Sequence, residues 1–196
     1  AEYLGLQNVR ILNPQQGILL KLATFVPEAQ AEAVRTALFE AGAGHIGAYD
    51  ACSFNIRGEG SFRASEGCQP FVGSVGTLHR EPEIRIETIL PKYLKSRVLR
   101  ALFATHPYEE PAFDFYSLEN EWQQAGSGIV GSLPEEEDER MFLQRIKETL
   151  ELHSLRHSHL TGRKIRKVAL CGGSGAFLIP EAIAAGAELF ITGEAK

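Results

Sequence analysis

Two stretches of this sequence follow the same plan, 64 positions apart. Residues 20–27 (LKLATFVP) correspond to residues 84–91 (IRIETILP), and residues 37–39 (ALF) correspond to residues 101–103 (ALF). Each copy has the pattern of a strand, a helix that starts at a proline, a tight exit and a further strand. A duplicated β-α-β unit of this length predicts a ferredoxin-like sandwich, in which two helices cover one face of an antiparallel sheet.

Composition limits the class of protein. Of the 196 residues, 44% are apolar and 23% are charged, which is enough for a hydrophobic core. The net charge of −5 argues against non-specific binding to nucleic acid or to anionic membranes, since both need a basic surface. No apolar run reaches the length of a membrane span, and the three widely spaced cysteines are typical of reduced thiols. We expect a cytoplasmic protein that contacts no membrane.

The duplicated module is expected to contain four strands, two helices and one hairpin. The predicted strands cover residues 18–26, 48–56, 83–89 and 112–118. One helix follows Pro27 and the other covers residues 91–104. Residues 57–76 are rich in glycine and small polar residues, which predicts a hairpin with long arms.

The remainder of the chain has a different pattern. Residues 13–17 form a turn-rich boundary and residues 119–128 a polar linker, after which residues 128–131 predict a short strand. Pro134 and the acidic run 135–138 predict the start of a helix, with Phe142, Ile146, Leu150 and Met141 on its buried face. Two strands, 167–171 and 188–192, flank a glycine-rich loop and a helix, which is typical of a parallel β-α-β unit.

The glycine-rich loop is the first candidate site. Loops of this kind, between a buried strand and a helix, let a ligand approach the backbone and favour an anion such as phosphate. The alternative is a tight turn that needs glycine for packing, because the lysine of a P-loop and the spacing of a Rossmann fingerprint are both missing. The next strand delivers its last residues to the same edge. The candidate ligand-binding residues are Gly172, Gly173, Ser174, Gly175, Thr192, Gly193 and Glu194.

The exits of the two duplicated helices form a second candidate site. His45, Cys52, His106 and Glu109 lie at corresponding corners of the two copies and have side chains that could bind a metal or a small ligand. The alternative is that the polar groups cap helix ends while proline and glycine shape the corners. The histidines 153, 157 and 159 have no acidic or cysteine partner nearby and indicate a solvated strand or loop.

Several longer motifs resemble one known family. These motifs cover residues 44–47 (GHIG), 52–54 (CSF), 58–62 (GEGSF), 106–111 (HPYEEP), 168–175 (VALCGGSG) and 191–194 (ITGE). They resemble the bacterial NGG-interacting-factor-three-like proteins, also called GTP cyclohydrolase 1 type 2 homologues. The resemblance implies an α/β body with a PII/CutA-like insert domain. We therefore expect residues 1–15 to end the first α/β half, residues 16–120 to form the insert, and residues 121–196 to form a truncated second half.

The resemblance also implies a function. Family members bind two divalent metal ions (zinc, iron or manganese) in a central cleft, assemble into a homohexamer and are regarded as metal-dependent hydrolases. The family's metal ligands include adjacent histidines, which this sequence lacks, so none is assigned to a residue here. One hypothesis is that the chain supplies the wall of the cleft for a phosphate-bearing or nucleotide-like ligand. The alternative is a non-catalytic module of the PII/CutA type that senses a small molecule or metal, or that mediates oligomer contacts.

Overall fold

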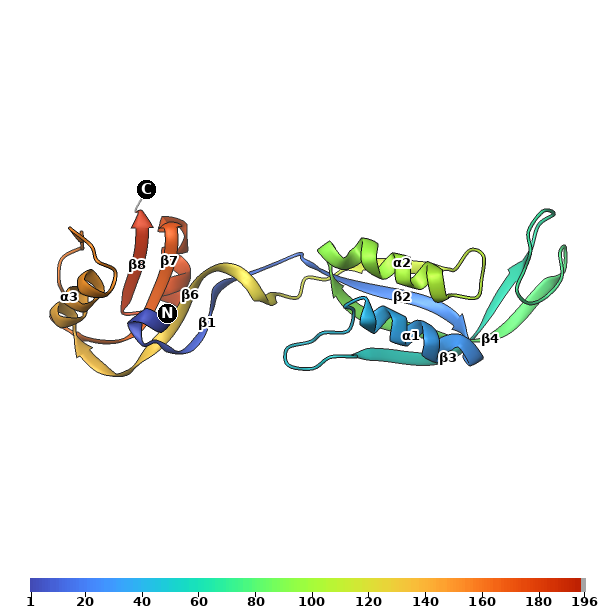
Figure 1. Ribbon diagram of the computed structural model, residues 1–196, viewed down its shortest axis with the longest axis horizontal. Coiled ribbons are helices and arrows are strands. Elements are labelled where there is room, and N and C mark those ends of the chain that lie inside the picture. The colour runs from blue at the N-terminus through green and yellow to red at the C-terminus, as the bar shows by residue number, and fades with distance from the viewer. Residues whose placement is uncertain (195–196) are drawn as a thin grey trace. The chain divides into compact units, whose positions relative to one another are not determined.

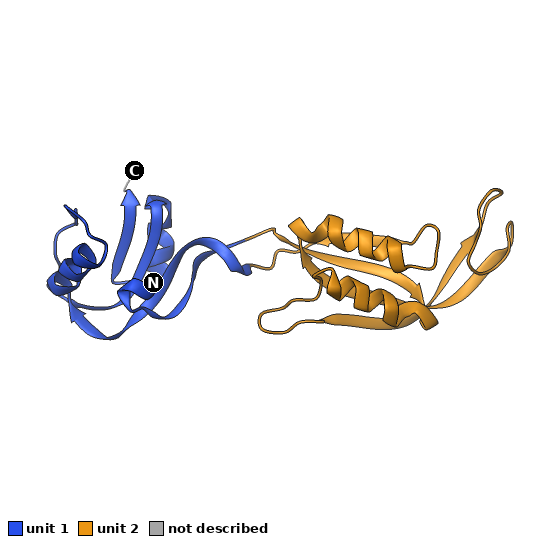
Figure 2. Cartoon of the chain, viewed as in Figure 1, with its two compact units in different colours: residues 1–15, 122–196 blue, residues 16–121 orange. Residues whose placement is uncertain are grey.

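The protein was analysed as a computed structural model, which describes residues 1–194. The chain divides into two compact units (Figure 2): unit 1 contains residues 1–15 and 122–194, and unit 2 contains residues 16–121. The sequence predicts boundaries at 15/16 and 120/121. No helix within the described residues is long and apolar enough to cross a membrane, and all three cysteines are free thiols.

Unit 2 has the predicted ferredoxin-like architecture. Its strands are β2 (Leu19–Pro27), β3 (Ser53–Arg63), β4 (Leu78–Pro91) and β5 (Phe113–Ser117), and they form an antiparallel sheet in the order β3-β4-β2-β5. Helices α1 (Ala31–Glu40) and α2 (Lys95–Thr105) cover one face of this sheet (Figure 1). A short 3-10 turn precedes each helix, Glu28–Gln30 before α1 and Lys92–Leu94 before α2.

Alternation along the strands separates the two faces of this sheet. Leu22 on β2 and Ile86 on β4 point toward the helices and are fully buried against Leu38 of α1 and Leu102 of α2. The opposite face has no helix over it and contains charged residues, including the pair formed by Lys21 and Glu87 at 3.0 Å. Unit 2 therefore buries one face of its sheet and leaves the other open.

Two predicted elements of unit 2 differ from the structure. The second strand begins at Ser53, because residues 41–52 form an irregular segment with one isolated bridge between Ile46 and Tyr49. The predicted hairpin is present, but its arms are the two strands themselves: β3 pairs with β4 without a break from Ser53 opposite Thr88 to Arg63 opposite Leu78. The predicted strand at 48–56 is therefore wrong in its first five residues.

Unit 1 is a four-stranded mixed sheet with its own core. Its strands are β1 (Gln7–Gln15), β6 (Trp122–Asp138), β7 (Lys164–Ser174) and β8 (Leu189–Glu194), in the order β1-β6-β7-β8. The pairs of β6 with β1 and with β7 are antiparallel, while β7 and β8 are parallel, as predicted. Helices α3 (Glu139–Thr149) and α4 (Ile179–Ala184) complete the unit, with the 3-10 turns Glu2–Leu4 and Ala176–Leu178.

The longest strand, β6, replaces three predicted features. Residues 122–128 of the predicted polar linker, the short strand predicted at 128–131 and the helix start predicted at 134–138 all belong to β6. Its pairing with β7 shifts between Ser132 and Glu137, and this irregularity accommodates Pro134, which cannot donate to a ladder. The helix starts later, where the Asp138 carboxylate accepts the backbone N–H of Arg140 at 2.9 Å and so caps α3.

The buried face of α3 is narrower than predicted. Phe142 and Ile146 are fully buried, but the side chain of Met141 is 67% exposed and that of Leu150 is 43% exposed. Helix α3 ends at Thr149, so Leu150 lies beyond its last turn. The predicted boundary at residues 13–17 is also wrong in part, since β1 continues to Gln15.

The core of unit 2 gives a stability prediction. Leu22→Ala removes a fully buried side chain and is expected to lower the free energy of unfolding of unit 2 by about 2–5 kcal/mol. Leu78→Ala makes the same chemical change where the side chain is 52% exposed, and we expect a much smaller loss. Urea unfolding followed by tyrosine circular dichroism reports on unit 2, which contains four of the five tyrosines. Equal losses in the two variants would contradict this assignment of the core.

Candidate functional site

The carboxyl ends of β7 and β8 bring together the seven residues of the first candidate site. Cys171 lies opposite Thr192, and Ser174 lies opposite Glu194, in parallel register. The Thr192 hydroxyl lies 2.9 Å from the carbonyl oxygens of both Gly173 and Glu194, so its single proton can serve one of them at a time. The N–H of Gly175 donates to the carbonyl of Glu194 at 3.3 Å. The two segments are therefore in direct contact at one edge of the sheet.

The glycines at this edge have different roles. A Cβ on Gly175 would lie 2.8 Å from both the Cβ of Cys171 and the hydroxyl of Thr192, and a Cβ on Gly193 would lie 3.1 Å from the nitrogen of Gly173. These two positions need glycine for packing. Gly172 is different, because a Cβ there would have no neighbour within 4 Å. The backbone at Gly172 is therefore open to an approaching molecule.

The expected glycine loop before a helix is wrong in detail. Gly172, Gly173 and Ser174 are the last residues of β7, and a 3-10 turn separates them from α4, which has only six residues. So short a helix has little dipole to attract an anion. The contacts of Gly175 favour the packing interpretation for that residue, whereas Gly172 and Gly173 have open space at their Cβ positions, Gly173 with a positive φ of 77°.

The corner residues of unit 2 do not form one site. His45 and Cys52 lie in the segment between α1 and β3, where the Cys52 carbonyl accepts the Thr88 hydroxyl at 2.9 Å. His106 and Glu109 lie in the turn after α2, at the other end of the sheet (Figure 1). In residues 1–194 no three His, Cys, Asp or Glu side chains are grouped closely enough to hold a metal ion. The structure therefore does not bring the four corner residues together into one group of metal ligands.

The contacts of the corner residues indicate structural roles. His106 is buried; its Nε2–H donates to the carbonyl of Phe25 at 2.9 Å, while its Nδ1 accepts the N–H of Tyr108 at 3.1 Å. Both ring nitrogens are thus used in the neutral imidazole, and burial lowers the pKa of His106. The Glu109 carboxylate accepts the N–H of Gln69 at 3.2 Å, and the Cys52 thiol lies 3.6 Å from the carbonyl of Asp50.

Three further histidines, His153, His157 and His159, are exposed, as expected. Residues 150–163 form no strand, and His153, His157 and His159 lie on this irregular segment. The only contact of the three is between His157 Nδ1 and the Ser158 carbonyl at 2.7 Å, among the residues that the structure describes. They therefore form a solvated loop face.

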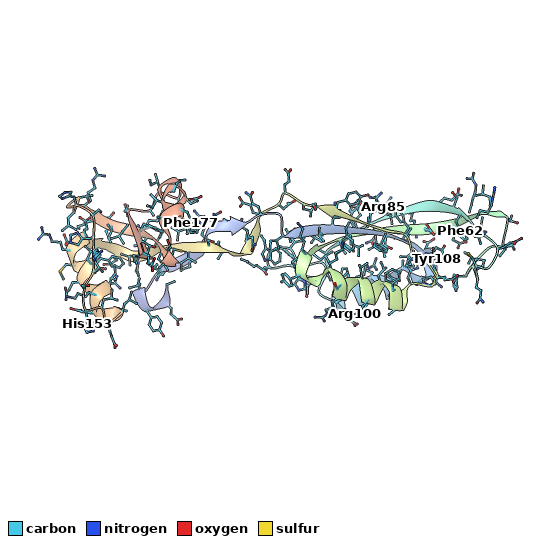
Figure 3. All side chains as sticks on the ribbon, turned by 90° about the horizontal axis from the view of Figure 1, so that it is seen from above. Phe62, Arg85, Arg100, Tyr108, His153 and Phe177 are labelled. Carbon is cyan, nitrogen blue, oxygen red and sulfur yellow. The ribbon has the colours of Figure 1, made fainter. Side chains whose placement is uncertain are left out.

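The structure also contains a cavity that the sequence did not predict. It has a volume of about 760 Å³ and lies entirely within unit 2. Its floor is the open face of β3 and β4, and its walls are the 64–71 segment and the turn that follows α2. Figure 3 shows Phe62, Arg85 and Tyr108, three of its lining residues, in this part of the chain.

One sequence signal could have indicated this cavity. Gly58, Gly60 and Phe62 alternate along β3 and share the face that is opposite the helices. A Cβ on Gly60 would collide with the Glu83 carboxylate, whereas a Cβ on Gly58 would have no neighbour within 4 Å. Glycines at every second position of a strand leave a bare patch on one face of the sheet. Here that patch becomes a hollow, because aromatic residues surround it.

His106 gives a prediction about pH. Burial lowers the pKa of His106 in the folded state, whereas in the unfolded chain His106 has the ordinary histidine pKa of about 6.5. Below that pH the unfolded chain binds more protons than the folded one. The stability of unit 2 therefore falls as the pH drops through about 6.5. We expect His106→Gln to weaken this pH dependence. His45→Gln, an exposed change in the same unit, should keep the wild-type dependence. Urea unfolding at about pH 7.5 and pH 5.5 measures it, and an unchanged slope in His106→Gln would refute the assignment.

Comparison with known proteins places this chain in a family. The family model of Duf34/NIF3 (NGG1p interacting factor 3) matches residues 1–196. The chain is 40% identical over 195 residues to the GTP cyclohydrolase 1 type 2 homolog of Halalkalibacterium halodurans, covering 99% of this chain and 52% of that protein. The homolog from Bacillus subtilis matches with the same identity and coverage. This chain thus spans about half the length of the curated relatives it matches.

Two solved structures also resemble this chain. The crystal structure of a Bacillus cereus protein related to NIF3 matches with a TM-score of 0.84 and 42% identity, over 99% of this chain and 51% of that chain. The Staphylococcus aureus protein SA1388 matches with a TM-score of 0.61 and 29% identity, over 100% of this chain and 50% of that chain. The fold, the sequence motifs and these matches together show that the chain belongs to the Duf34/NIF3 (NGG1p interacting factor 3) family.

Proposed function

We propose that this chain is part of a metal-dependent hydrolase that acts on a small phosphate-bearing or nucleotide-like substrate. Family membership supports the proposal, and so does the name of the relatives, GTP cyclohydrolase 1 type 2 homolog. The same resemblance supports a cytoplasmic homohexamer. Two divalent ions, zinc, iron or manganese, would be held by residues outside this chain, since residues 1–194 do not group the side chains to bind one.

The edge formed by β7 and β8 is the part of this chain that we assign to the substrate cleft. In α/β sheets, ligands bind at the carboxyl ends of parallel strands, and β7 and β8 are the parallel pair of unit 1. The open backbone at Gly172 carries the proposal, because no side chain blocks the approach of a phosphate oxygen there. The Thr192 hydroxyl of β8, 2.9 Å from the carbonyl oxygens of both Gly173 and Glu194, links the ends of the two strands.

The role of the chain's own residues is then positional. They would orient the substrate against the reacting centre and exclude water from one side of it. Orientation of this kind needs a rigid surface. The tight contacts of Gly175 and Gly193 with the neighbouring strand give this edge that rigidity.

The role of Gly172 can be tested by substitution in a chain extended to the full length of the relatives. Gly172→Ala should leave the melting temperature unchanged, because its Cβ meets no atom, and should lower the rate of hydrolysis about tenfold through the loss of one backbone contact. Gly175→Ala is the matched control, whose Cβ would be only 2.8 Å from two neighbours. It should lower the melting temperature. Full activity in a folded Gly172→Ala variant would exclude this edge from the cleft.

Metal content tests the proposal as a whole. Elemental analysis should find no stoichiometric metal in the 196-residue chain, because the described residues offer no group of ligands. About two metal ions per chain are expected in the full-length form, in line with a two-metal hydrolase. Metal bound to the 196-residue chain would refute the assignment of the ligands to other residues. A metal-free and inactive full-length protein would refute the hydrolase.

A further inference from the structure

The cavity of unit 2 has the size and lining of a small-molecule site. Its volume of about 760 Å³ falls within the range of roughly 300–1,000 Å³ that is typical of ligand pockets. It lies within one unit, apart from the β7–β8 edge to which hydrolysis is assigned, and does not depend on that assignment.

Aromatic rings form much of the cavity wall. Phe62 and Tyr108 pack with their ring centroids 5.8 Å apart, and Phe71 lies 6.3 Å from Tyr108. Phe25 contributes a fourth ring from β2 and lies beneath the guanidinium of Arg85 at 5.6 Å. Rings arranged in this way offer faces and edges against which a planar ligand can stack.

A chain of contacts holds this wall in place. The Tyr108 hydroxyl donates to the Glu83 carboxylate at 2.9 Å. Burial, together with the charge of Glu83, raises the pKa of Tyr108, so the hydroxyl remains a neutral donor. The backbone N–H of Tyr108 also donates to Nδ1 of His106, and Nε2–H of the same ring donates to the carbonyl of Phe25. The aromatic wall is therefore pre-formed, which reduces the entropy lost when a ligand binds.

The acidic groups of the cavity are mostly satisfied by partners in the chain. Glu59 pairs with Arg80 at 2.6 Å, Glu83 accepts from Tyr108, and Glu109 accepts from Gln69. Glu110 also lines the cavity and is exposed to solvent. A cationic ligand would have to compete for carboxylates that are already engaged.

Two arginines of the lining retain unused hydrogen-bond donors. Arg85 bonds to Glu87 through one terminal nitrogen at 2.8 Å, but its Nε is buried and has no hydrogen-bond partner among residues 1–194. Arg63 has no ion-pair partner within the described residues, while Arg57 is paired with Glu28 at 2.7 Å. An acidic group on a ligand would supply the acceptor that these donors lack.

We propose that the hollow bounded by Gly58, Phe62, Arg85 and Tyr108 binds a small, planar, ring-containing organic anion. The ring lies against Phe62 and Tyr108 over the bare strand at Gly58, and the acidic group is bound by Arg85 with Arg63 at the rim. Gly58 provides the space, because a Cβ there would have no neighbour within 4 Å, whereas a Cβ on Gly60 would collide with the Glu83 carboxylate.

Two fluorescent probes test this proposal. 1-Anilinonaphthalene-8-sulfonate has fused rings and one sulfonate, and N-phenyl-1-naphthylamine has the same rings without the charge. With the 196-residue chain in its native state, we expect one saturable site for the sulfonate, and weaker binding of the neutral probe. Arg85→Gln should weaken the sulfonate about tenfold and change the neutral probe less than about twofold, because only the charged probe loses a partner.

The control variants locate the site. Gly58→Val should weaken both probes at least about tenfold by filling the hollow. Arg100→Gln removes an arginine from α2, on the helix-covered side of unit 2 (Figure 3), and should change the binding of neither probe. Circular dichroism confirms that each variant is folded.

Three results would overturn the proposal. Sulfonate binding that survives Gly58→Val would show that the probe binds outside the hollow. Equal weakening of both probes by Arg85→Gln would show that Arg85 does not bind the acidic group. Absence of saturable sulfonate binding to the folded 196-residue chain would show that the hollow is not a site for such an anion. Metal content and hydrolysis are measured separately, so the failure of either proposal can be distinguished from that of the other.

Discussion

The antiparallel pair formed by β1 and β6 is the constraint on which the whole chain depends. The chain leaves unit 1 after Gln15 and returns at Trp122, and these two residues face each other in the ladder. A segment of more than one hundred residues can be placed between them without disturbing the sheet, since its two ends need only be adjacent. Within unit 2 the two ends of this segment are adjacent as well, because the N–H of Leu118 donates to the Leu19 carbonyl at 3.0 Å.

Within unit 2, the two sequence copies are alike in their helices, which pack on the same face of the sheet, and differ in the strands that follow the helices. Helix α1 begins at Ala31 and α2 at Lys95, which keeps the spacing of 64 positions. Both helices must cover the same sheet face with the same periodicity of apolar residues, so their pattern is visible in the sequence. The strands that follow the helices differ in length and role. After α2, β5 is a short edge strand, whereas β3, which follows α1, extends beside β4 and forms part of the floor of the cavity.

An element could be predicted where its packing leaves a pattern in the sequence, and could not be predicted where it does not. The sandwich and the parallel β7–β8 pair could be predicted, because apolar periodicity and proline positions mark their strands and helices. β6 could not, because Trp122–Asp138 is polar, contains glycine, and includes Pro134 followed by acidic residues, which is also the pattern of a helix start. For His106 the sequence left a ligand-binding role and a structural role open, since only the fold shows that Phe25 and Tyr108 occupy both ring nitrogens.

Glycine shows most clearly why site residues need a structure. Gly58, Gly60, Gly172 and Gly175 look alike in the sequence, yet the space where a Cβ would be is filled at Gly60 and Gly175 and empty at Gly58 and Gly172. A filled space means that glycine serves packing, and its loss would strain the fold. An empty space means that the fold itself tolerates a side chain, so glycine there leaves room for another molecule. Among the glycines without a positive φ, each unit contains one with open space at its Cβ position, Gly172 at the end of a parallel strand in unit 1 and Gly58 on the floor of an aromatic hollow in unit 2.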